Sequence, residues 1–288
     1  MKILNGAELA GYMKENQAHQ VRALQAKKIQ PRLVIIRDSD QPVIAKYVRL
    51  KKRYGEDIGI AVEDLLVDDV SGAIEYSSGR TDVHGMIVQL PLKCSMQTDE
   101  IIAQISPAKD VDGLATDIHL MNNVKNDYSS GDIISEKNQP RFESATATAI
   151  NWLMAGYDIK LDGRKIAIVG HGRLVGTPLE RMWKNSGYDV RIFDKGDDLA
   201  ELRDFDVIVS ATGVPHLIKN SMVKTGAVVV DAGTASEGGV LVGDVEESVR
   251  ERDDLAAITP KIGGVGPLTV AALFEHVLIA ANHTTSGF

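Results

Sequence analysis

The sequence predicts an α/β protein of two domains, the second of which has a Rossmann-like parallel sheet. The segment 165–178 reads KIAIVGHGRLVGTP, a short apolar strand that ends in a glycine-rich turn. Further apolar strands over 188–193, 206–210 and 227–231 each end in small or polar residues, as in an open α/β sheet that binds ligands at its carboxyl edge. With 288 residues, the chain is long enough for two domains.

The glycine turn predicts a dinucleotide site. Gly170, Gly172 and Gly176 follow the first strand with the spacing G-x-G-x-x-x-G, one residue longer than the usual fingerprint, and a helix-like segment follows over 179–185. This arrangement directs backbone N–H groups and a helix N-terminus toward a pyrophosphate. Asp194 ends the second strand about two dozen residues after Gly170, and its carboxylate can accept hydrogen bonds from ribose hydroxyls, which favours NAD over NADP.

The turn after each strand supplies the candidate cofactor contacts. An α/β domain with tight turns and no nucleotide is the alternative, and the acidic residue at the end of the second strand argues against it. The candidates are Gly170, His171, Gly172, Arg173, Val175 and Gly176 after the first strand, Asp194 after the second, Ala211, Thr212 and Gly213 after the third, and Thr234 after the fourth.

Composition excludes several classes of protein. Hydrophobic residues make up 44% of the chain and charged residues 25%, as in ordinary globular proteins. The formal net charge of −8 argues against a nucleic-acid surface or a basic membrane patch. The N-terminus does not resemble a signal peptide, and no apolar stretch of transmembrane length is expected. The single cysteine, Cys94, suggests a cytoplasmic protein. The seven histidines lack ligand-like spacing, so we expect no metal site.

The N-terminal half predicts alternating helices and strands. Pro42 can start the second helix, because proline fits the first turn. The polar segment 122–140 predicts a connection between domains, a helix is expected over 144–154, and the apolar segment 270–281 predicts a buried helix that packs on the N-terminal domain. The predicted order is a helix from Asn5 or Gly6 to about Lys28, a strand over 32–37, a helix over 43–58, a strand over 60–67, a helix or irregular segment over 71–80, a strand over 83–90, and a helix from Thr98 or Asp99 to Ile105.

Lys51 stands on an otherwise apolar helix face. Ile44, Tyr47, Val48 and Lys51 follow the spacing i, i+3, i+4, i+7, so they share one side of the predicted helix. The amine must therefore point inward or into a cleft, where partial desolvation lowers its pKa toward that of a general base. The alternative is a lysine whose stem covers apolar surface, and helix position alone favours that alternative.

Three further segments carry candidate site residues. Gln89 ends a predicted strand just before Pro91; a polar residue there either belongs to a site or satisfies the strand end. Asp110 and Asp112 flank a valine in a loop, and such acids are either solvated turn residues or bidentate acceptors for the donors of a ring. The segment 258–269 has two prolines and three glycines, which predicts a rigid loop of close backbone approach.

Four motifs carry a resemblance to a known family. Residues 47–51 (YVRLK), 88–92 (VQLPL), 109–113 (KDVDG) and 263–269 (GGVGPLT) resemble, in this order, the motifs Y-V-x-x-K, V-Q-L-P-L, K-D-V-D-G and G-G-V-G-P-M-T of the bifunctional methylenetetrahydrofolate dehydrogenase/cyclohydrolase family. The resemblance covers nearly the whole chain. It implies a folate-binding catalytic domain over 1–120, completed by 265–288, a dinucleotide-binding domain over 141–264, and a cleft between the two domains.

The resemblance also implies roles for individual residues. Lys51 is the implied catalytic lysine, Gln89 its hydrogen-bonding partner, Tyr47 the ring that stacks on the folate, and Asp112 the anchor of the pterin. In the implied reactions, hydride passes from 5,10-methylenetetrahydrofolate to NAD or NADP, and water then converts the methenyl product to 10-formyltetrahydrofolate with help from Lys51. Homodimers are expected on the same ground. The implied substrate contacts are Tyr47, Gln89, Leu90, Pro91, Asp112, Gly264 and Pro267.

Departures from the family pattern leave alternatives open. His171 and Gly172 replace an arginine and a serine of the family's turn, which favours NAD, although Arg173 can partly compensate. Residues 144–149 keep only Thr146 of the P-C-T-P-x-G stretch. The alternatives are a dehydrogenase without cyclohydrolase activity, a two-domain dehydrogenase acting on an amino acid or a shikimate-like acid, and a non-catalytic nucleotide-binding paralogue.

Overall fold

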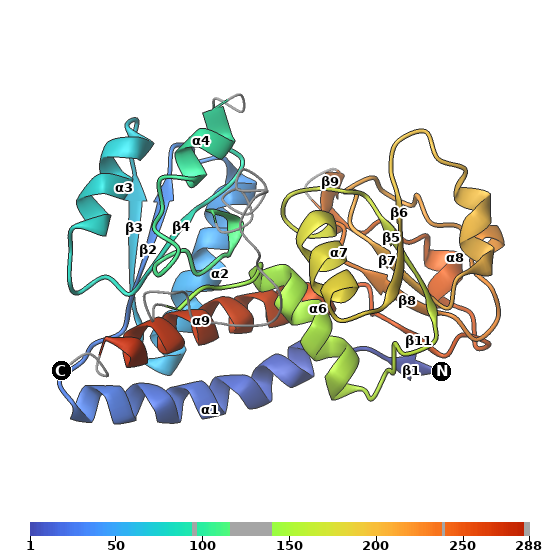
Figure 1. Ribbon diagram of the computed structural model, residues 1–288, viewed down its shortest axis with the longest axis horizontal. Helices are drawn as coiled ribbons and strands as arrows, with labels where there is room; N and C mark the ends of the chain where they lie inside the picture. Colours follow the sequence, from blue (N-terminus) through green and yellow to red (C-terminus); the bar gives the residue numbers. More distant parts are fainter. Residues whose placement is uncertain (94–96, 116–139, 238–239, 285–288) are drawn as a thin grey trace. The chain divides into compact units, whose positions relative to one another are not determined.

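A computed structural model provides the structure, and it consists of two compact units (Figure 1). One unit combines Met1–Gly11 with Thr146–Thr269, and the other combines Tyr12–Ala145 with Val270–Phe288. The predicted class, a two-domain α/β protein with parallel sheets, is confirmed. Cys94 and nearly all of the connection predicted between the domains lie outside the described residues, which are 1–93, 97–115, 140–237 and 240–284.

The unit that contains the glycine turn has a six-stranded sheet in the order β1-β11-β8-β7-β5-β6, and every pairing in it is parallel. Apolar side chains of β5, β6, β7 and β8 fill its core. The strands are β1 (Lys2–Ile3), β5 (Lys165–Val169), β6 (Asp189–Phe193), β7 (Val207–Ser210), β8 (Val228–Asp231) and β11 (Ala257–Ile258).

Shorter elements complete this unit. Helix α7 (Gly176–Asn185) follows the glycine turn, and α6 (Ala145–Gly156) precedes β5. Strand β9 (Ala235–Glu237) pairs in antiparallel fashion with β10 (Val240–Val242). The remaining elements are the 3-10 helices η2 (Leu199–Asp204) and η3 (Asn220–Met222) and the short helix α8 (Glu247–Arg250).

Two strands of this sheet were not expected from the sequence. Lys2–Ile3 pairs in parallel with Ala257–Ile258, so the first residues of the chain add an edge strand to the sheet of the glycine turn. A strand of two residues is too short to show a periodic pattern, and both residues of β1 are exposed. The pairing also places Gly6 against Gly264, where a Cβ on Gly6 would lie 2.0 Å from the Gly264 carbonyl oxygen.

The second unit has a three-stranded parallel sheet in the order β3-β2-β4. One face of the sheet packs against α3 and α4, forming a core that contains Val34, Ile36, Met86 and Ile74. Helix α2 covers the other face (Figure 1). The elements of this unit are α1 (Gly6–Ala26), β2 (Arg32–Arg37), α2 (Pro42–Ile58), β3 (Ala61–Leu66), α3 (Val70–Ser78), β4 (Gly85–Val88), α4 (Thr98–Ile102) and α9 (Val265–His283); α1 and α9 each begin in residues of the other unit.

Helix α2 forms where the sequence predicts it, and its ends have clear causes. A proline occupies its first turn, and Gly59 ends it in the left-handed conformation at φ +87°, donating its N–H to the Gly55 carbonyl. Ile44, Val48 and Ile58 are buried. A Cβ on Gly55 would lie 2.4 Å from a methyl carbon of Val62, so this glycine lets the helix approach β3 closely.

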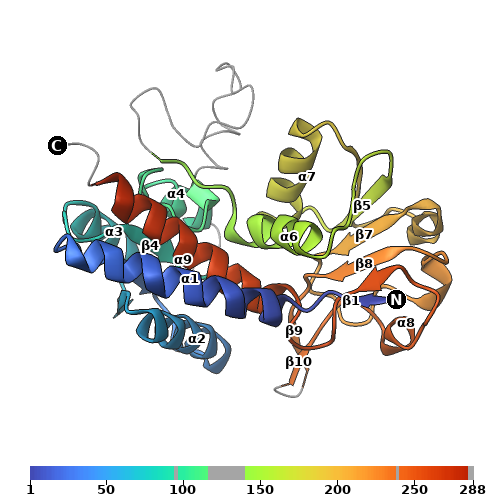
Figure 2. The same ribbon diagram turned by 90° about the horizontal axis from the view of Figure 1, so that it is seen from below.

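The expectation that no apolar stretch reaches transmembrane length is wrong for α9. By length and composition, this helix could cross a membrane. It is a core helix of this unit instead, since most of its side chains are buried in the protein. It lies beside α1 in both views (Figures 1 and 2), where the Gln17 amide donates to the Ala271 carbonyl at 2.8 Å. Phe274 stacks on Tyr54 with ring centroids 5.1 Å apart. The predicted packing of this helix on the N-terminal part of the chain is therefore confirmed.

Candidate active site and nucleotide site

Lys51 contacts Gln89 through its amine. The Lys51 Nζ atom donates a hydrogen bond of 2.7 Å to Oε1 of Gln89. Gln89 follows β4 directly; its backbone N–H donates to the Ile36 carbonyl and its Nε2 atom to the Leu90 carbonyl at 3.1 Å. The amide of Gln89 is thus oriented by its own strand end. Helix α2 supplies the lysine of this pair and the carboxyl end of β4 supplies the glutamine. The sequence had indicated the two residues only as separate candidates.

Burial shifts the pKa values of Lys51 and of its charged neighbour Asp112. Burial lowers the pKa of Lys51 below its ordinary value, and the negative charge of Asp112 offsets part of that effect. Burial likewise raises the pKa of Asp112, and the positive charge of Lys51 opposes the rise. Gln89 contributes no charge. The amine is therefore easier to deprotonate than an exposed lysine, as a general base near neutral pH requires.

The loop that carries Asp112 is held from two sides. The ring of His276 on α9 contacts the Val111 carbonyl at 2.8 Å through Nδ1, and since a carbonyl only accepts, Nδ1 must carry the proton. The Asp112 carbonyl accepts from the Ala145 N–H at 3.2 Å. Gly113 has φ +75°, and a Cβ there would lie 2.4 Å from the Glu143 backbone, so only glycine fits.

The other predicted folate contacts divide between the units. Tyr47 lies one helical turn before Lys51 on α2 and is partly buried. Leu90 and Pro91 follow Gln89 directly, and the peptide bond between them is cis. Gly264 and Pro267 belong to the unit of the glycine turn, so their relation to Lys51 stays a prediction.

The glycine turn has the close backbone contacts that a dinucleotide site needs. Gly170 has φ +94°, a conformation that favours glycine. A Cβ on Gly176 would lie 2.0 Å from the Gly170 carbonyl oxygen, so α7 can begin directly against the turn only because residue 176 is glycine. Val175, at the N-cap of α7, provides no side-chain cap. These features fit a pyrophosphate at the positive end of the helix.

The remaining cofactor candidates follow neighbouring parallel strands. Val169 pairs with Phe193 and with Ser210, and Ser210 pairs with Asp231, so the carboxyl ends of four strands lie in register. The structure therefore brings the predicted contacts to one edge of the sheet. They are the turn 170–176, Asp194 after β6, Ala211, Thr212 and Gly213 after β7, and Thr234 after β8.

His171 is tied to α7 by an acidic neighbour. Its Nε2 atom lies 2.8 Å from Oε2 of Glu180, and Oε1 of Glu180 accepts from Lys184 at 2.7 Å. Although burial acts to raise the pKa of Glu180, hydrogen bonds from Lys184 and His171 hold that pKa below its usual value. A carboxylate therefore stands beside the residue that replaces the family's arginine. The sequence alone had not indicated Glu180.

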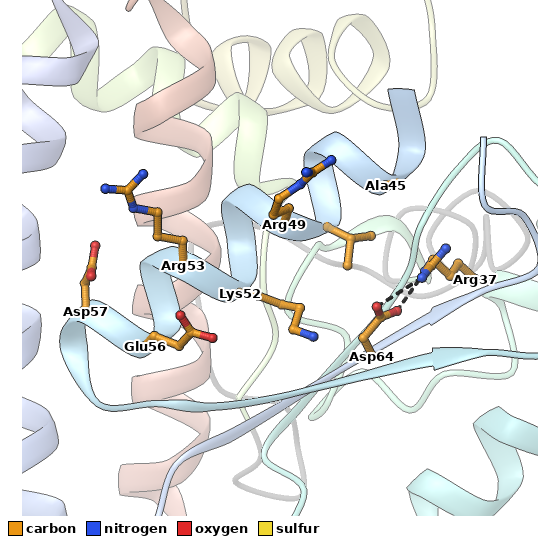
Figure 3. Close-up of a pocket in the computed structure, with 9 residues that line it drawn as sticks. Arg37, Ala45, Arg49, Lys52, Arg53, Glu56, Asp57 and Asp64 are labelled. Carbon is orange, nitrogen blue, oxygen red and sulfur yellow. Dashed lines mark hydrogen bonds and ion pairs between the residues drawn. The ribbon is translucent and has the colours of Figure 1, made fainter. Parts of the chain in front are cut away.

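A cavity of about 550 Å³ lies beside α2, on a face of the helix other than the one that carries Lys51 (Figure 3). At 3.6 residues per turn, its lining residues Ala45, Arg49, Lys52 and Glu56 are on another side of the helix from Lys51. Its charges largely offset one another. Arg37 donates to both carboxylate oxygens of Asp64, at 2.8 and 3.1 Å, as the dashed lines in Figure 3 show. The full lining is Arg37, Ala45, Val48, Arg49, Lys52, Arg53, Glu56, Asp57 and Asp64, so none of the catalytic candidates contributes to it.

A parallel sheet with a glycine turn, together with a lysine–glutamine pair in a separate unit, defines the class: a two-domain α/β enzyme that uses a dinucleotide. Residues 4–112 match the model of the tetrahydrofolate dehydrogenase/cyclohydrolase catalytic domain. Residues 144–285 match that of the tetrahydrofolate dehydrogenase/cyclohydrolase NAD(P)-binding domain. The chain belongs to the tetrahydrofolate dehydrogenase/cyclohydrolase family.

Individual relatives agree with this assignment over their full length. The chain is 37% identical to the bifunctional protein FolD of Hydrogenobaculum sp. (strain Y04AAS1), with 97% of this chain and 98% of that protein covered. The crystal structure of the bifunctional enzyme FolD from Campylobacter jejuni has a TM-score of 0.86 and 32% identity, with 99% of each chain covered. The FolD structure from Trypanosoma brucei, complexed with NADP and an inhibitor, has a TM-score of 0.85 and 26% identity over 98% of each chain.

Proposed function

We propose that this protein oxidises 5,10-methylenetetrahydrofolate to 5,10-methenyltetrahydrofolate with NAD or NADP and hydrolyses the product to 10-formyltetrahydrofolate. The observation that carries the proposal is the partly buried Lys51 amine, hydrogen bonded to the neutral Gln89 with Asp112 as its charged neighbour. Both domain models of the family match the chain, which supports both steps. The folate domain is proposed over 1–120 with 265–288, and the dinucleotide domain over 141–264.

Lys51 acts in the hydrolytic step as the group that moves protons. A water oxygen forms a bond to the methenyl carbon while the neutral amine of Lys51 takes the proton from that water. The tetrahedral intermediate then collapses: its hydroxyl loses its proton to solvent as the carbon–oxygen double bond forms, its bond to N5 breaks, and the ammonium of Lys51 returns the first proton to that nitrogen. One proton is thus released overall. Gln89 keeps the amine in place by accepting its hydrogen bond, and Asp112 accepts donors of the pterin. Tyr47 stacks on the folate one helical turn away.

The dehydrogenase step relies on placement more than on acid–base chemistry. When bound, the nicotinamide accepts the hydride from the methylene carbon. The chain contributes the glycine turn at Gly170 and Gly176 against the pyrophosphate, and the turns after β7 and β8 toward the rest of the dinucleotide. Leu90, Pro91, Gly264 and Pro267 are proposed to contact the folate. Both ligands are needed for this step, whereas hydrolysis needs only the folate.

NAD is the preferred cofactor in this proposal. Asp194 follows β6 with an exposed side chain, where it can accept hydrogen bonds from the ribose hydroxyls and repel a 2′-phosphate. His171 is paired with Glu180, which adds a second carboxylate near the turn. Both features disfavour the additional charge of NADP.

One assay tests the activity and separates the alternatives. Purified protein is supplied with methylenetetrahydrofolate and then with NAD or NADP, while absorbance follows methenyl formation and decay. Formation followed by accelerated decay is expected, and faster formation with NAD. Methenyl that accumulates without enzymatic decay would identify a dehydrogenase alone. Absence of turnover with any folate, in a protein that still binds a dinucleotide, would identify a non-catalytic paralogue.

The protein is further proposed to be a cytoplasmic homodimer, for which the family resemblance is the support. Light scattering coupled to size-exclusion chromatography checks the oligomeric state. A mass close to the 31.2 kDa of one chain would contradict the dimer.

A further inference from the structure

Asp244 is a fully buried carboxylate behind the proposed nucleotide site. Its Oδ2 atom accepts three hydrogen bonds: from the Ser210 hydroxyl at 2.7 Å, from the Thr212 backbone N–H at 2.7 Å and from the Thr212 hydroxyl at 2.9 Å. The Thr212 hydroxyl in turn accepts from the Val214 N–H at 3.1 Å. Asp244 therefore fixes the end of β7 and the turn that follows it.

The other carboxylate oxygen of Asp244 contacts the turn after β8. Oδ1 is buried and has no hydrogen-bond partner among the described residues. A Cβ on Gly233 would lie 1.9 Å from it, so the carboxylate rests against the backbone of this glycine. Any larger residue at position 233 would displace the carboxylate. Asp244 thus also fixes the segment that leads into Thr234.

A second carboxylate, Asp231, holds Asp244 in place. Asp231 accepts from the backbone N–H groups of Asp244 at 3.0 Å and Val245 at 3.1 Å, and it forms an ion pair with Arg250 at 2.5 Å. A Cβ on Gly243 would lie 2.0 Å from its Oδ2 atom. Each carboxylate therefore packs against a glycine close in sequence to the other: Asp244 against Gly233, and Asp231 against Gly243. Burying two acids so close together is costly, which suggests that their geometry serves the site.

The turn fixed by Asp244 packs directly on the glycine turn. A Cβ on Gly170 would lie 2.9 Å from the Ala211 carbonyl oxygen and 2.9 Å from a methyl carbon of Thr212. A displacement of residues 211–213 would therefore also shift the backbone at Gly170. One buried side chain connects three of the strand-end turns that are proposed to contact the dinucleotide.

We propose that Asp244 is a positioning residue of the nucleotide site, which holds the turns after β7 and β8 in the arrangement that binds the dinucleotide. This inference rests on the proposed function, because it concerns the same cofactor. Asp244 does not touch the cofactor in this scheme. It acts through Thr212 and Gly233, and its removal leaves buried donors without an acceptor.

The test measures cofactor binding apart from folate chemistry. In Asp244→Asn, one amide oxygen replaces the acceptor while the amide nitrogen faces Gly233, so the dissociation constant of NADH, measured by fluorescence titration, is expected to rise about tenfold. Hydrolysis of methenyltetrahydrofolate without dinucleotide should stay within about twofold of wild type, because Lys51 and Gln89 belong to the other unit. Asp254→Asn is the matched control; Asp254 is also a carboxylate that accepts from a threonine hydroxyl, that of Thr225, at 2.7 Å, and it should leave the constant unchanged.

A milder pair of variants decides the matter if Asp244→Asn does not fold. Ser210→Ala removes one 2.7 Å hydrogen bond to Asp244, and Thr225→Ala removes one 2.7 Å hydrogen bond to Asp254, three residues before β8 begins. Ser210→Ala should weaken NADH binding about threefold, and Thr225→Ala should not. Wild-type NADH affinity in a folded Asp244→Asn or Ser210→Ala variant would overturn this inference but leave the proposed function standing. Failure of the wild-type protein to bind NADH or NADPH would overturn the proposed function instead.

Discussion

Lys51 donates a hydrogen bond of 2.7 Å to Gln89 across 38 residues of sequence. The bond joins helix α2 to the carboxyl end of β4, and it pairs a titratable amine with an acceptor that has no charge. A carboxylate in the place of Gln89 would raise the pKa of the amine, whereas an amide leaves burial as the main influence. Because burial and this hydrogen bond set the state of the amine, substituting Lys51 or its charged neighbour tests its role directly.

Replacing Lys51 by methionine should abolish hydrolysis and spare cofactor binding. The substitution keeps an unbranched side chain but removes the base, so methenyltetrahydrofolate hydrolysis should fall by about 100-fold or more. The dissociation constant of NADH should not change. Lys52→Met is the matched control, since Lys52 neighbours Lys51 but lines the cavity on another face of α2. Hydrolysis that persists in Lys51→Met would remove Lys51 from its proposed role.

The pH profile of hydrolysis should respond to Asp112. A general base works in its deprotonated form, so kcat/KM should rise with pH through the pKa of Lys51, which burial places below the ordinary 10.5. Asp112 raises that pKa through its charge. In Asp112→Asn the rising limb should therefore move to lower pH, together with a higher KM for the folate. Asp57→Asn, near the C-terminus of α2, should leave the limb in place. A limb that moves to higher pH would contradict the electrostatic account.

Cofactor preference should depend on Asp194. Asp194→Ala removes the carboxylate that can bind the ribose hydroxyls, so NAD should lose about 1 to 2 kcal/mol of binding relative to NADP. The kcat/KM ratio of the two cofactors measures this. Asp189→Ala, an exposed residue at the opposite end of β6, is the control. If the ratio is the same in Asp194→Ala as in the wild type, NAD preference has another origin.

His276 should make the fold sensitive to acid. Burial lowers its pKa to about 4 from the ordinary 6.5, although the hydrogen bond to Val111 acts in the opposite sense. Between these values the unfolded chain binds the proton more readily than the folded one, so the stability this group confers is complete above pH 6.5 and is lost as the pH falls toward 4. The loss attributable to His276 between pH 7 and pH 4 should be roughly 3 kcal/mol.

The measurement compares urea unfolding at the two pH values in the wild type and in His276→Gln. The glutamine amide can still donate to the Val111 carbonyl but does not titrate. The free energy of unfolding should therefore fall less on acidification in the variant. Equal losses in the two proteins would show that His276 does not account for acid sensitivity.

Local patterns were enough to predict most of the longer helices and strands. The i, i+3, i+4, i+7 spacing around Lys51 predicted α2, and the β-branched runs predicted the longer strands of both sheets. The helix α9 was expected from its apolar composition, but its capacity to span a membrane by length was not recognised. The strands β1 and β11 were missed because two residues carry no period.

The candidate site was predicted in part. Lys51, Gln89 and Asp112 were recognised as candidates, and the structure joins the first two by a hydrogen bond and couples the third to Lys51 by charge. His276 and Asp244 were not recognised. A histidine in an apolar helix and an acid after a glycine are common in any sequence, and only their buried partners distinguish them.

By itself, the sequence determined where helices and strands form and which turns are rich in glycine, because periodicity and backbone freedom act over a few neighbouring residues. The tertiary structure alone decided that the amine of α2 meets the amide at the end of β4, and that Asp244 supports turns 32 and 11 residues away in the chain. Those contacts depend on packing between elements distant in sequence. Burial, which shifts the pKa of Lys51, is likewise a property of the assembled fold.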